Sequence, residues 1–214
     1  MSKSSTLATL RTLVQAGFLR ETQPGPRYTL GMALIRLGDL TARQQLPGDL
    51  TRPILRELSE STGMTARLAI ADDGFPVFVE RVDGPGAVRF HTPLGSRELP
   101  HSTAAGKAIL AQLEEAEVVS LCSDRPPVRR TARTITEMSA LLSELRHIRR
   151  RGYSLDNEED AEGIFCAGSA FRFYGGIAAV SVTGIKGDMT QAEMRGVGEV
   201  VQDHAQRLAK LLQG

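Results

Sequence analysis

The chain has 214 residues, of which 41% are hydrophobic and 24% are charged, and its formal net charge is +1. This composition is typical of a soluble globular protein, and no apolar run approaches the ~18 residues of a membrane span, so we expect no membrane partner and a cytoplasmic location. The two cysteines, Cys122 and Cys166, stand in unrelated contexts. Their spacing argues against a disulfide framework and against a paired zinc motif.

The first elements along the chain form a small group. Apolar residues recur at helical spacing in "KSSTLATLRTLVQA", and Gly17 stands where that helix would end. Two short strands, 18–22 and 27–30, are predicted next, on either side of a Pro- and Gly-rich turn. Helical patterns over 32–45 and 49–62 follow.

Beyond Gly63 the pattern changes to the alternation of half-buried strands. Three strands are predicted at 65–71, 75–82 and 87–93, then helices at 103–113, 114–122 and 136–152, two further strands at 163–173 and 175–184, and a last helix at 190–212. Thr190 with Glu193 three residues later predicts a capped start for that helix. This order predicts an α+β fold in which helices cover an antiparallel sheet.

Three signatures together resemble the IclR family of bacterial transcription regulators. "KSSTLATLRTLVQAGFLRE…RYTLG" is similar to the family's recognition helix and wing, "LPHSTAAGKAILA" to its small-residue motif, and "GYSLDNEEDAEGIFCAGSAF" with "IAAVSVTG" to its closing strands. The resemblance covers essentially the whole chain. It implies a partial winged helix-turn-helix over residues 1–30, a linker helix over 31–46, and a GAF-like effector-binding domain over 47–214.

The chain departs from the family pattern at its beginning. The helix that resembles the recognition helix starts almost at Met1, so the two helices that normally precede it are missing from this sequence. A start codon assigned too late, a shortened sequence and a natural short form are the three explanations.

The stretch "HSTAAGKAIL" offers the first candidate site. A phosphate-binding loop of the Walker type would need Gly at position 101 and Ser or Thr at position 108, where the chain has His101 and Ala108. What remains is a helix start whose N–H groups, at Ala104, Ala105 and Gly106, favour a carboxylate. The alternative is that the small side chains only permit close packing. The resemblance implies that these N–H groups receive the acid group of an effector.

A second candidate cluster lies on the closing strands. Ser181 and Thr183 share one face of their strand by its period of two. The resemblance maps them, together with Asp156 and Cys166, onto positions that contact the effector, and it suggests Phe90, Val88 and Leu94 as an apolar wall. Without the resemblance, hydroxyls that satisfy neighbouring backbone groups and a small buried Cys166 are the simpler interpretation.

The same residues include the side chains of two further chemistries, nucleophilic catalysis and zinc binding. Cys166 with His101 or His91 invites a thiol-nucleophile interpretation, but one sequence gives no oriented constellation. A zinc site built from His91, His101, Asp156 and Cys166 lacks the short paired spacings of metal motifs. We therefore expect no enzyme activity, no catalytic residue, no metal and no cofactor.

The first helix and the hairpin carry the candidate DNA contacts. Residues near the start of a recognition helix approach base edges, and a wing holds the backbone. These residues are Lys3, Ser4, Ser5, Thr6 and Arg11 on the helix and Arg27 in the wing. A plain solvated helix face is the alternative, and only the family's order of elements favours DNA.

Together these patterns predict a ligand-responsive transcription regulator. Its expected partners are operator DNA, a small organic acid and further copies of itself, in a homodimer or homotetramer. The rival hypothesis is an effector-binding domain that no longer binds DNA and acts through oligomerisation.

Overall fold

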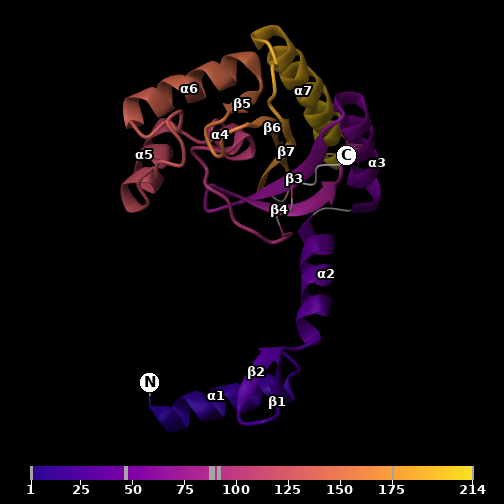
Figure 1. The fold of residues 1–214 in the computed structure, drawn as a ribbon, viewed down its shortest axis with the longest axis vertical. Coiled ribbons are helices and arrows are strands. Elements are labelled where there is room, and N and C mark those ends of the chain that lie inside the picture. The colour runs from indigo at the N-terminus through magenta and orange to yellow at the C-terminus, as the bar shows by residue number, and fades with distance from the viewer. Residues whose placement is uncertain (1, 46–47, 87–89, 91–92, 175, 214) are drawn as a thin grey trace. The chain divides into compact units, whose positions relative to one another are not determined.

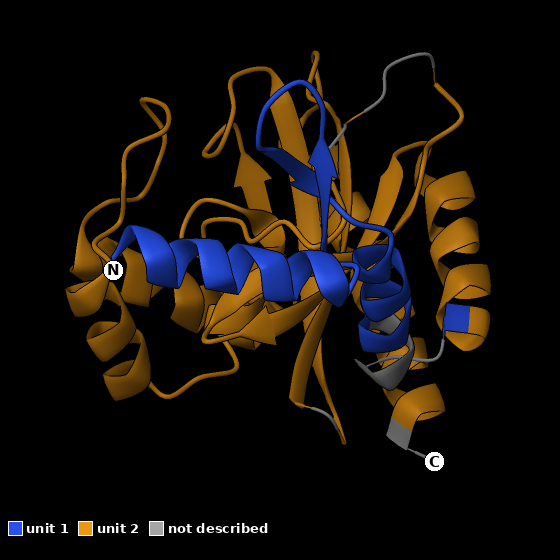
Figure 2. Ribbon diagram, turned by 90° about the horizontal axis from the view of Figure 1, so that it is seen from below, with its two compact units in different colours: residues 1–48 blue, residues 49–214 orange. Residues whose placement is uncertain are grey.

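The computed structural model describes residues 2–45, 48–86, 90, 93–174 and 176–213. It divides the chain into two compact units, residues 1–48 and residues 49–214 (Figure 2). The domain boundary expected between residues 46 and 47 falls outside the described residues.

The first unit is a helix, a hairpin and a second helix, as the sequence predicted. Its elements are α1 (Lys3–Gln15), β1 (Leu19–Thr22), β2 (Arg27–Leu30) and α2 (Ala33–Gln45). The hydroxyl of Ser2 caps α1 by accepting the N–H of Ser5 at 3.2 Å. None of the side chains described between residues 2 and 41 is buried, so this unit has no core of its own there.

The second unit is an antiparallel sheet with helices on both faces, which confirms the α+β class. Its elements are α3 (Gly48–Thr62), β3 (Thr65–Asp72), β4 (Phe75–Val82), α4 (Ala104–Leu110), α5 (Glu115–Asp124), α6 (Met138–Arg151), β5 (Ser154–Asn157), β6 (Ile164–Phe173), β7 (Gly176–Ile185) and α7 (Gln191–Gln213). The five strands lie in the order β4-β3-β7-β6-β5.

The distribution of strands differs from the prediction. The candidate strand at 87–93 falls largely outside the described residues, and neither Phe90 nor Pro93 is in a strand. Conversely, β5 is a strand that was not predicted, and it pairs with β6 in the register Asp156 to Cys166. A strand of four residues is too short to show a clear alternation, and only pairing with β6 reveals it.

Helices cover both faces of the sheet (Figure 1). α3 and α7 lie on one face, and α4 lies against the other, with α5 and α6 outside it. The predicted cap of α7 is confirmed, because the N–H of Thr190 donates to Glu193 at 2.7 Å and the N–H of Glu193 donates to the Thr190 hydroxyl at 3.3 Å.

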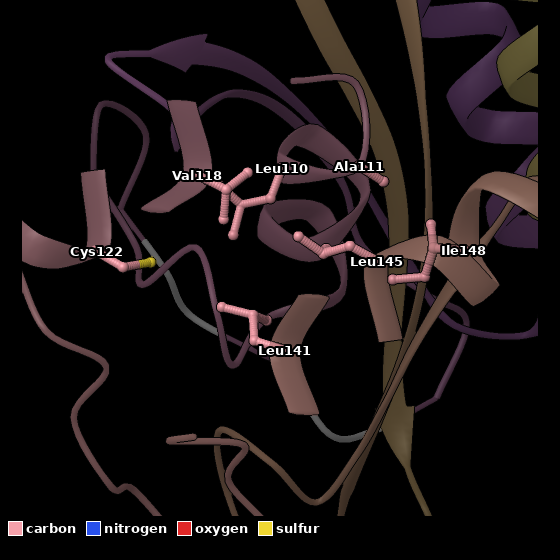
Figure 3. Packing of buried hydrophobic residues seen from close by; sticks show 7 residues of the cluster. All are labelled: Leu110, Ala111, Val118, Cys122, Leu141, Leu145 and Ile148. Carbon is pink, nitrogen blue, oxygen red and sulfur yellow. The ribbon is translucent and has the colours of Figure 1, made fainter. Parts of the chain in front are cut away.

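The short helix α4 is the centre of this arrangement, since all seven of its residues are buried. One side packs through Ala105 and Ile109 on small residues of the sheet, Ala69 and Ala179. The other side contributes to a hydrophobic cluster with α5 and α6 (Figure 3). This cluster consists of Leu110, Ala111, Val118, Cys122, Leu141, Leu145 and Ile148.

Gly168 on β6 sets the distance between α4 and the sheet. A Cβ atom at this position would lie 2.8 Å from the carbonyl carbon of Ala104, which is backbone and cannot swing away. The start of α4 therefore rests directly on β6.

We expect Gly168→Ala to destabilise the second unit by about 1–3 kcal/mol, because the extra methyl group overpacks the joint between α4 and β6. Gly196→Ala is the matched control: Gly196 lies inside α7 with nothing within 4 Å of its added Cβ, so this change should stabilise the helix slightly. Chemical unfolding of both variants gives the comparison. Equal stabilities for Gly168→Ala and wild type would contradict this account of the joint.

Candidate functional site

The sheet face under α4 changes character at the beginning of the helix. The residues directly under α4 are small and apolar, whereas the residues past the N-terminal end of the helix are polar. In the ladders, Gly168 is opposite Ser181 and Ser181 is opposite Arg67, while Asp156, Cys166 and Thr183 follow one another across β5, β6 and β7. Residues directly opposite one another share a face, so these side chains meet on the same side of the sheet as α4.

A cavity of about 180 Å³ opens over this polar face. The sheet forms its floor, the start of α4 forms one wall, and the loop after β5 forms another. Its lining residues are Arg67, Phe78, Phe90, Glu98, Thr103, Ala104, Ala105, Asp156, Asp160, Ala161, Ile164, Cys166, Ser181 and Thr183. Its volume suits a small molecule.

The structure brings together most of the residues expected to bind the effector. The lining contains Ala104, Ala105, Asp156, Cys166, Ser181, Thr183 and Phe90. The N–H groups of Ala104 and Ala105 belong to the first turn of α4, which leaves them without acceptors inside the helix.

Gly106 does not fit its expected role. Its N–H donates to the Thr103 hydroxyl at 3.2 Å, and it is not a lining residue. A Cβ here would lie 2.5 Å from the Cα of Pro100, so Gly106 serves close packing. Of the suggested apolar wall, Leu94 is 58% exposed and outside the lining, and Val88 lies outside the described residues.

Asp156 is held rigidly at the edge of the cavity. Its Oδ1 accepts the N–H groups of Glu159 at 2.7 Å and Asp160 at 3.3 Å, and the residue is only 1% exposed. Burial raises the pKa of the Asp156 carboxyl to about 7, although Lys107 and the two N–H donors act in the opposite direction. Near neutral pH this carboxyl can therefore either donate or accept a hydrogen bond.

A buried ion pair stands behind Asp156. Lys107 on α4 is fully buried, and its ammonium group binds the Glu159 carboxylate and donates to the carbonyl of Leu155 at 2.7 Å. Burial also raises the pKa of Glu159, against the effect of Lys107. This pair fixes the loop after β5 to α4 and so determines the shape of the cavity wall.

Cys166 has the properties of a structural thiol. It donates to the Thr183 hydroxyl at 3.4 Å, and burial, followed by the nearby Asp156, raises its pKa well above the usual range. The thiolate, which is the nucleophilic form, is therefore disfavoured. His101 instead contacts the carbonyl of Val128 at 2.9 Å.

A metal site is not evident in the part of the chain that the structure describes. There, no three side chains among His, Cys, Asp and Glu come close enough to hold an ion. His91, one member of the zinc alternative, lies outside the described residues.

Three charged residues of the lining were not among the predicted site residues: Arg67, Glu98 and Asp160. Arg67 is 6% exposed and lies opposite Ser181. The signal was present, because the alternation of "TARLAIA" places Arg67 on the same face as Thr65 and Ala69. A buried arginine within an otherwise apolar strand indicates a special role.

The residues expected to contact DNA all lie in the first unit and are exposed. Lys3, Ser4, Ser5 and Thr6 form the first turn of α1, and Arg11 lies farther along the same helix. Arg27 begins β2, opposite Thr22 in the hairpin. The Thr6 hydroxyl donates its proton to the Ser2 carbonyl at 3.1 Å. The hydroxyl oxygen can therefore still accept a hydrogen bond from a partner.

Across the described residues, every helix is too short or too polar to span a lipid bilayer.

Comparison with known proteins identifies a family of transcriptional regulators. Residues 48–210 match the family model described as bacterial transcriptional regulator IclR C-terminal. The chain is 32% identical over 219 residues to the HTH-type transcriptional regulator XynR of Escherichia coli K12, covering 99% of this chain and 85% of that protein. It is 35% identical over 169 residues to the HTH-type transcriptional regulator KdgR of the same organism, covering 78% of this chain and 63% of KdgR.

The fold has solved counterparts as well. The crystal structure of the Thermotoga maritima IclR superposes with a TM-score of 0.81 at 30% sequence identity, covering 100% of this chain and 87% of that one. This similarity extends over both units of the chain.

The raised pKa of Asp156 predicts how stability depends on pH. The folded state holds a proton that the unfolded chain releases near pH 3.9, so the free energy of unfolding should fall as pH rises from about 4 to about 7, by up to about 1.4 kcal/mol per pH unit. Asp156→Asn keeps an Oδ1 acceptor but does not titrate. It should match wild type below about pH 4 and be more stable above about pH 7, and the pH dependence that remains in its free energy of unfolding should come from Glu159.

Urea unfolding across this pH range makes the measurement. Asp188→Asn is the control, because Asp188 is exposed and should leave the wild-type slope unchanged. Identical pH dependence of Asp156→Asn and wild type would contradict the assignment.

Proposed function

The chain belongs to the IclR family of bacterial transcriptional regulators, and from that premise we propose that it is a DNA-binding regulator that senses a small organic acid. The family consists of transcriptional regulators and not of enzymes. The observation that carries the proposal is the cavity, in which polar side chains from β3, β5, β6 and β7 converge at the start of α4.

Asp156, Cys166, Ser181 and Thr183 are proposed to form the polar wall that binds the effector. They offer hydroxyl, thiol and carboxyl groups at neighbouring positions of three adjacent strands. Ala104 and Ala105 add N–H donors, and Phe90 adds an apolar contact. A small acid that also carries a hydroxyl or keto group has matching acceptors and donors.

The proposed DNA-binding surface is the start of α1 together with the hairpin. Its exposed hydroxyls and cations, at Lys3, Ser4, Ser5, Thr6, Arg11 and Arg27, are groups that read base edges or hold phosphates. An effector changes DNA affinity only through its different affinities for two arrangements of the protein. Because α2 and α3 are consecutive in the chain, the segment that joins them is one route for this coupling.

Self-association is proposed as the third property. α2 exposes Leu34, Ile35, Leu37 and Leu40, with exposed fractions between 37% and 66%. An exposed apolar stripe on a helix is typical of a surface that pairs with another helix. We propose that a second copy of the chain covers it, in a homodimer or a homotetramer.

The alternative function is an effector-binding protein that does not bind DNA and acts through oligomerisation. One observation favours it: none of the side chains described between residues 2 and 41 is buried, so this unit has little packing to hold a DNA-binding surface in place.

Replacing Ser181 by Ala together with Asp156 by Asn should weaken binding of a small acid by roughly a hundredfold, because two polar contacts are lost or altered. Calorimetric titration with pyruvate, lactate and glycerate measures it. Ser169→Ala is the matched control, since Ser169 is a buried serine on β6 that donates to the Gly152 carbonyl at 2.8 Å outside the cavity. Unchanged affinity in the double variant would exclude this cavity as the effector site.

Arg11→Ala and Arg27→Ala should each weaken binding to the promoter region next to the protein's own gene and make binding less sensitive to salt, because each change removes a cation near phosphate. Gel-shift titrations at several salt concentrations test this, with exposed Arg150→Ala on α6 as control. If wild type forms oligomers but fails to shift the promoter, the alternative function is favoured.

A further inference from the structure

Arg67 lines the cavity but is not among the proposed effector contacts. Its side chain lines the cavity from the middle of β3, with the guanidinium carbon 5.2 Å from the centre of the Phe78 ring. Directly across the ladder lies Ser181, one of the proposed effector contacts. A buried cation is therefore fixed beside the polar wall.

The cavity lining holds more acidic than basic side chains, so a bound anion would depend on this cation. Among the lining residues that the structure describes, Arg67 is the one cationic side chain, whereas Glu98, Asp156 and Asp160 are acidic. Lys107 is not a lining residue, and its ammonium group is held by Glu159 and Leu155. An anion entering this cavity meets three carboxyl groups and one positive charge.

Two of the three carboxyl groups are already accommodated by the protein. Asp160 accepts the Ser102 hydroxyl at 2.8 Å and lies 3.7 Å from Arg130. Asp156 accepts two backbone N–H groups.

Glu98 is the carboxylate that faces Arg67. The distance from its Oε1 to the Arg67 Nη1 is 3.8 Å, and its side chain is 24% exposed. Its backbone is anchored, because its N–H donates to the Pro76 carbonyl at 3.0 Å. The Glu98 carboxylate is thus the group with which an anion entering the cavity would compete for the guanidinium.

We propose that Arg67 recognises the acid group of the effector, and that this acid group takes the place of Glu98 at the guanidinium. The inference rests on the proposed function, and it names the side chain that selects an anion. A guanidinium presents a planar fork of donors that matches a carboxylate in two hydrogen bonds. The N–H groups at the start of α4 contribute only partial charge, since that helix has seven residues.

The experiment compares acids with their uncharged amides. Pyruvate, lactate and glycerate, each beside its amide, are titrated calorimetrically into wild type and into Arg67→Met, Arg67→Lys and Glu98→Gln. Methionine retains apolar contact with Phe78 while removing the charge. Arg81→Met is the matched control, because Arg81 lies opposite Arg67 in the ladder but binds Asp83 at 2.9 Å and does not line the cavity.

Wild type should bind the acids roughly ten- to a hundredfold more tightly than the amides, and Arg67→Met should lose that preference. Arg67→Lys should retain part of it, and Arg81→Met all of it. Glu98→Gln should bind the acids several-fold more tightly than wild type, because the competing carboxylate is removed. A gain of affinity cannot arise from a poorly folded variant.

Four results would overturn the inference. An unchanged preference in Arg67→Met removes the role of Arg67 and leaves the proposed acid sensing intact wherever the Ser181 and Asp156 variant still loses binding. Equal binding of acids and amides by wild type means that the charge of the acid is not recognised, and it contradicts the proposed acid sensing together with this inference. Weaker acid binding by Glu98→Gln contradicts the displacement of Glu98. Failure of wild type to bind any of the acids contradicts the proposed function itself and this inference with it.

Discussion

The second unit depends on burying α4 completely, including the charge of Lys107. A helix enclosed by a sheet on one side and by α5 and α6 on the other leaves no route for the ammonium group to water. Such a charge is tolerated only with close partners, because its desolvation costs several kcal/mol. Glu159 and the carbonyl of Leu155 are these partners, and both belong to β5 or the loop after it. One ion pair therefore ties the helix to the loop that carries Asp156 and Asp160.

Glycines in α4 and in the strand beneath it allow the close packing that shapes one wall of the cavity. Gly106 lets the first turn approach Pro100, and Gly168 lets the same turn rest on β6. Because the turn lies so low on the sheet, Ala104 and Ala105 line the cavity together with the polar residues of its floor. One close contact therefore fixes both the packing of α4 and the shape of the cavity beside it.

The cavity contains a carboxyl group with a raised pKa, Asp156, and a buried arginine, Arg67. Burial raises the pKa of the Asp156 carboxyl to about 7, and the Arg67 guanidinium lines the same cavity. A ligand that carries one acid group and one hydroxyl or keto group complements this pair. Since Arg67 belongs to β3 and Asp156 to β5, a ligand that contacts both would extend across β7 and β6 on one face of the sheet. That is a suitable place for a small molecule to favour one arrangement of the protein over another.

Local patterns in the sequence determined much of this protein. Helical periodicity located every helix, the Thr190 cap was recognisable from its spacing with Glu193, and the period of two placed Ser181 and Thr183 on one face. The family motifs likewise indicated the correct family.

The tertiary structure alone decided which strands are neighbours. β5 exists because β6 pairs with it, Arg67 enters the site because β3 lies beside β7, and the N–H of Gly106 is lost to the Thr103 cap. Periodicity acts between residues close in sequence, whereas strand order and the competition for each donor are set by contacts between residues far apart in the chain.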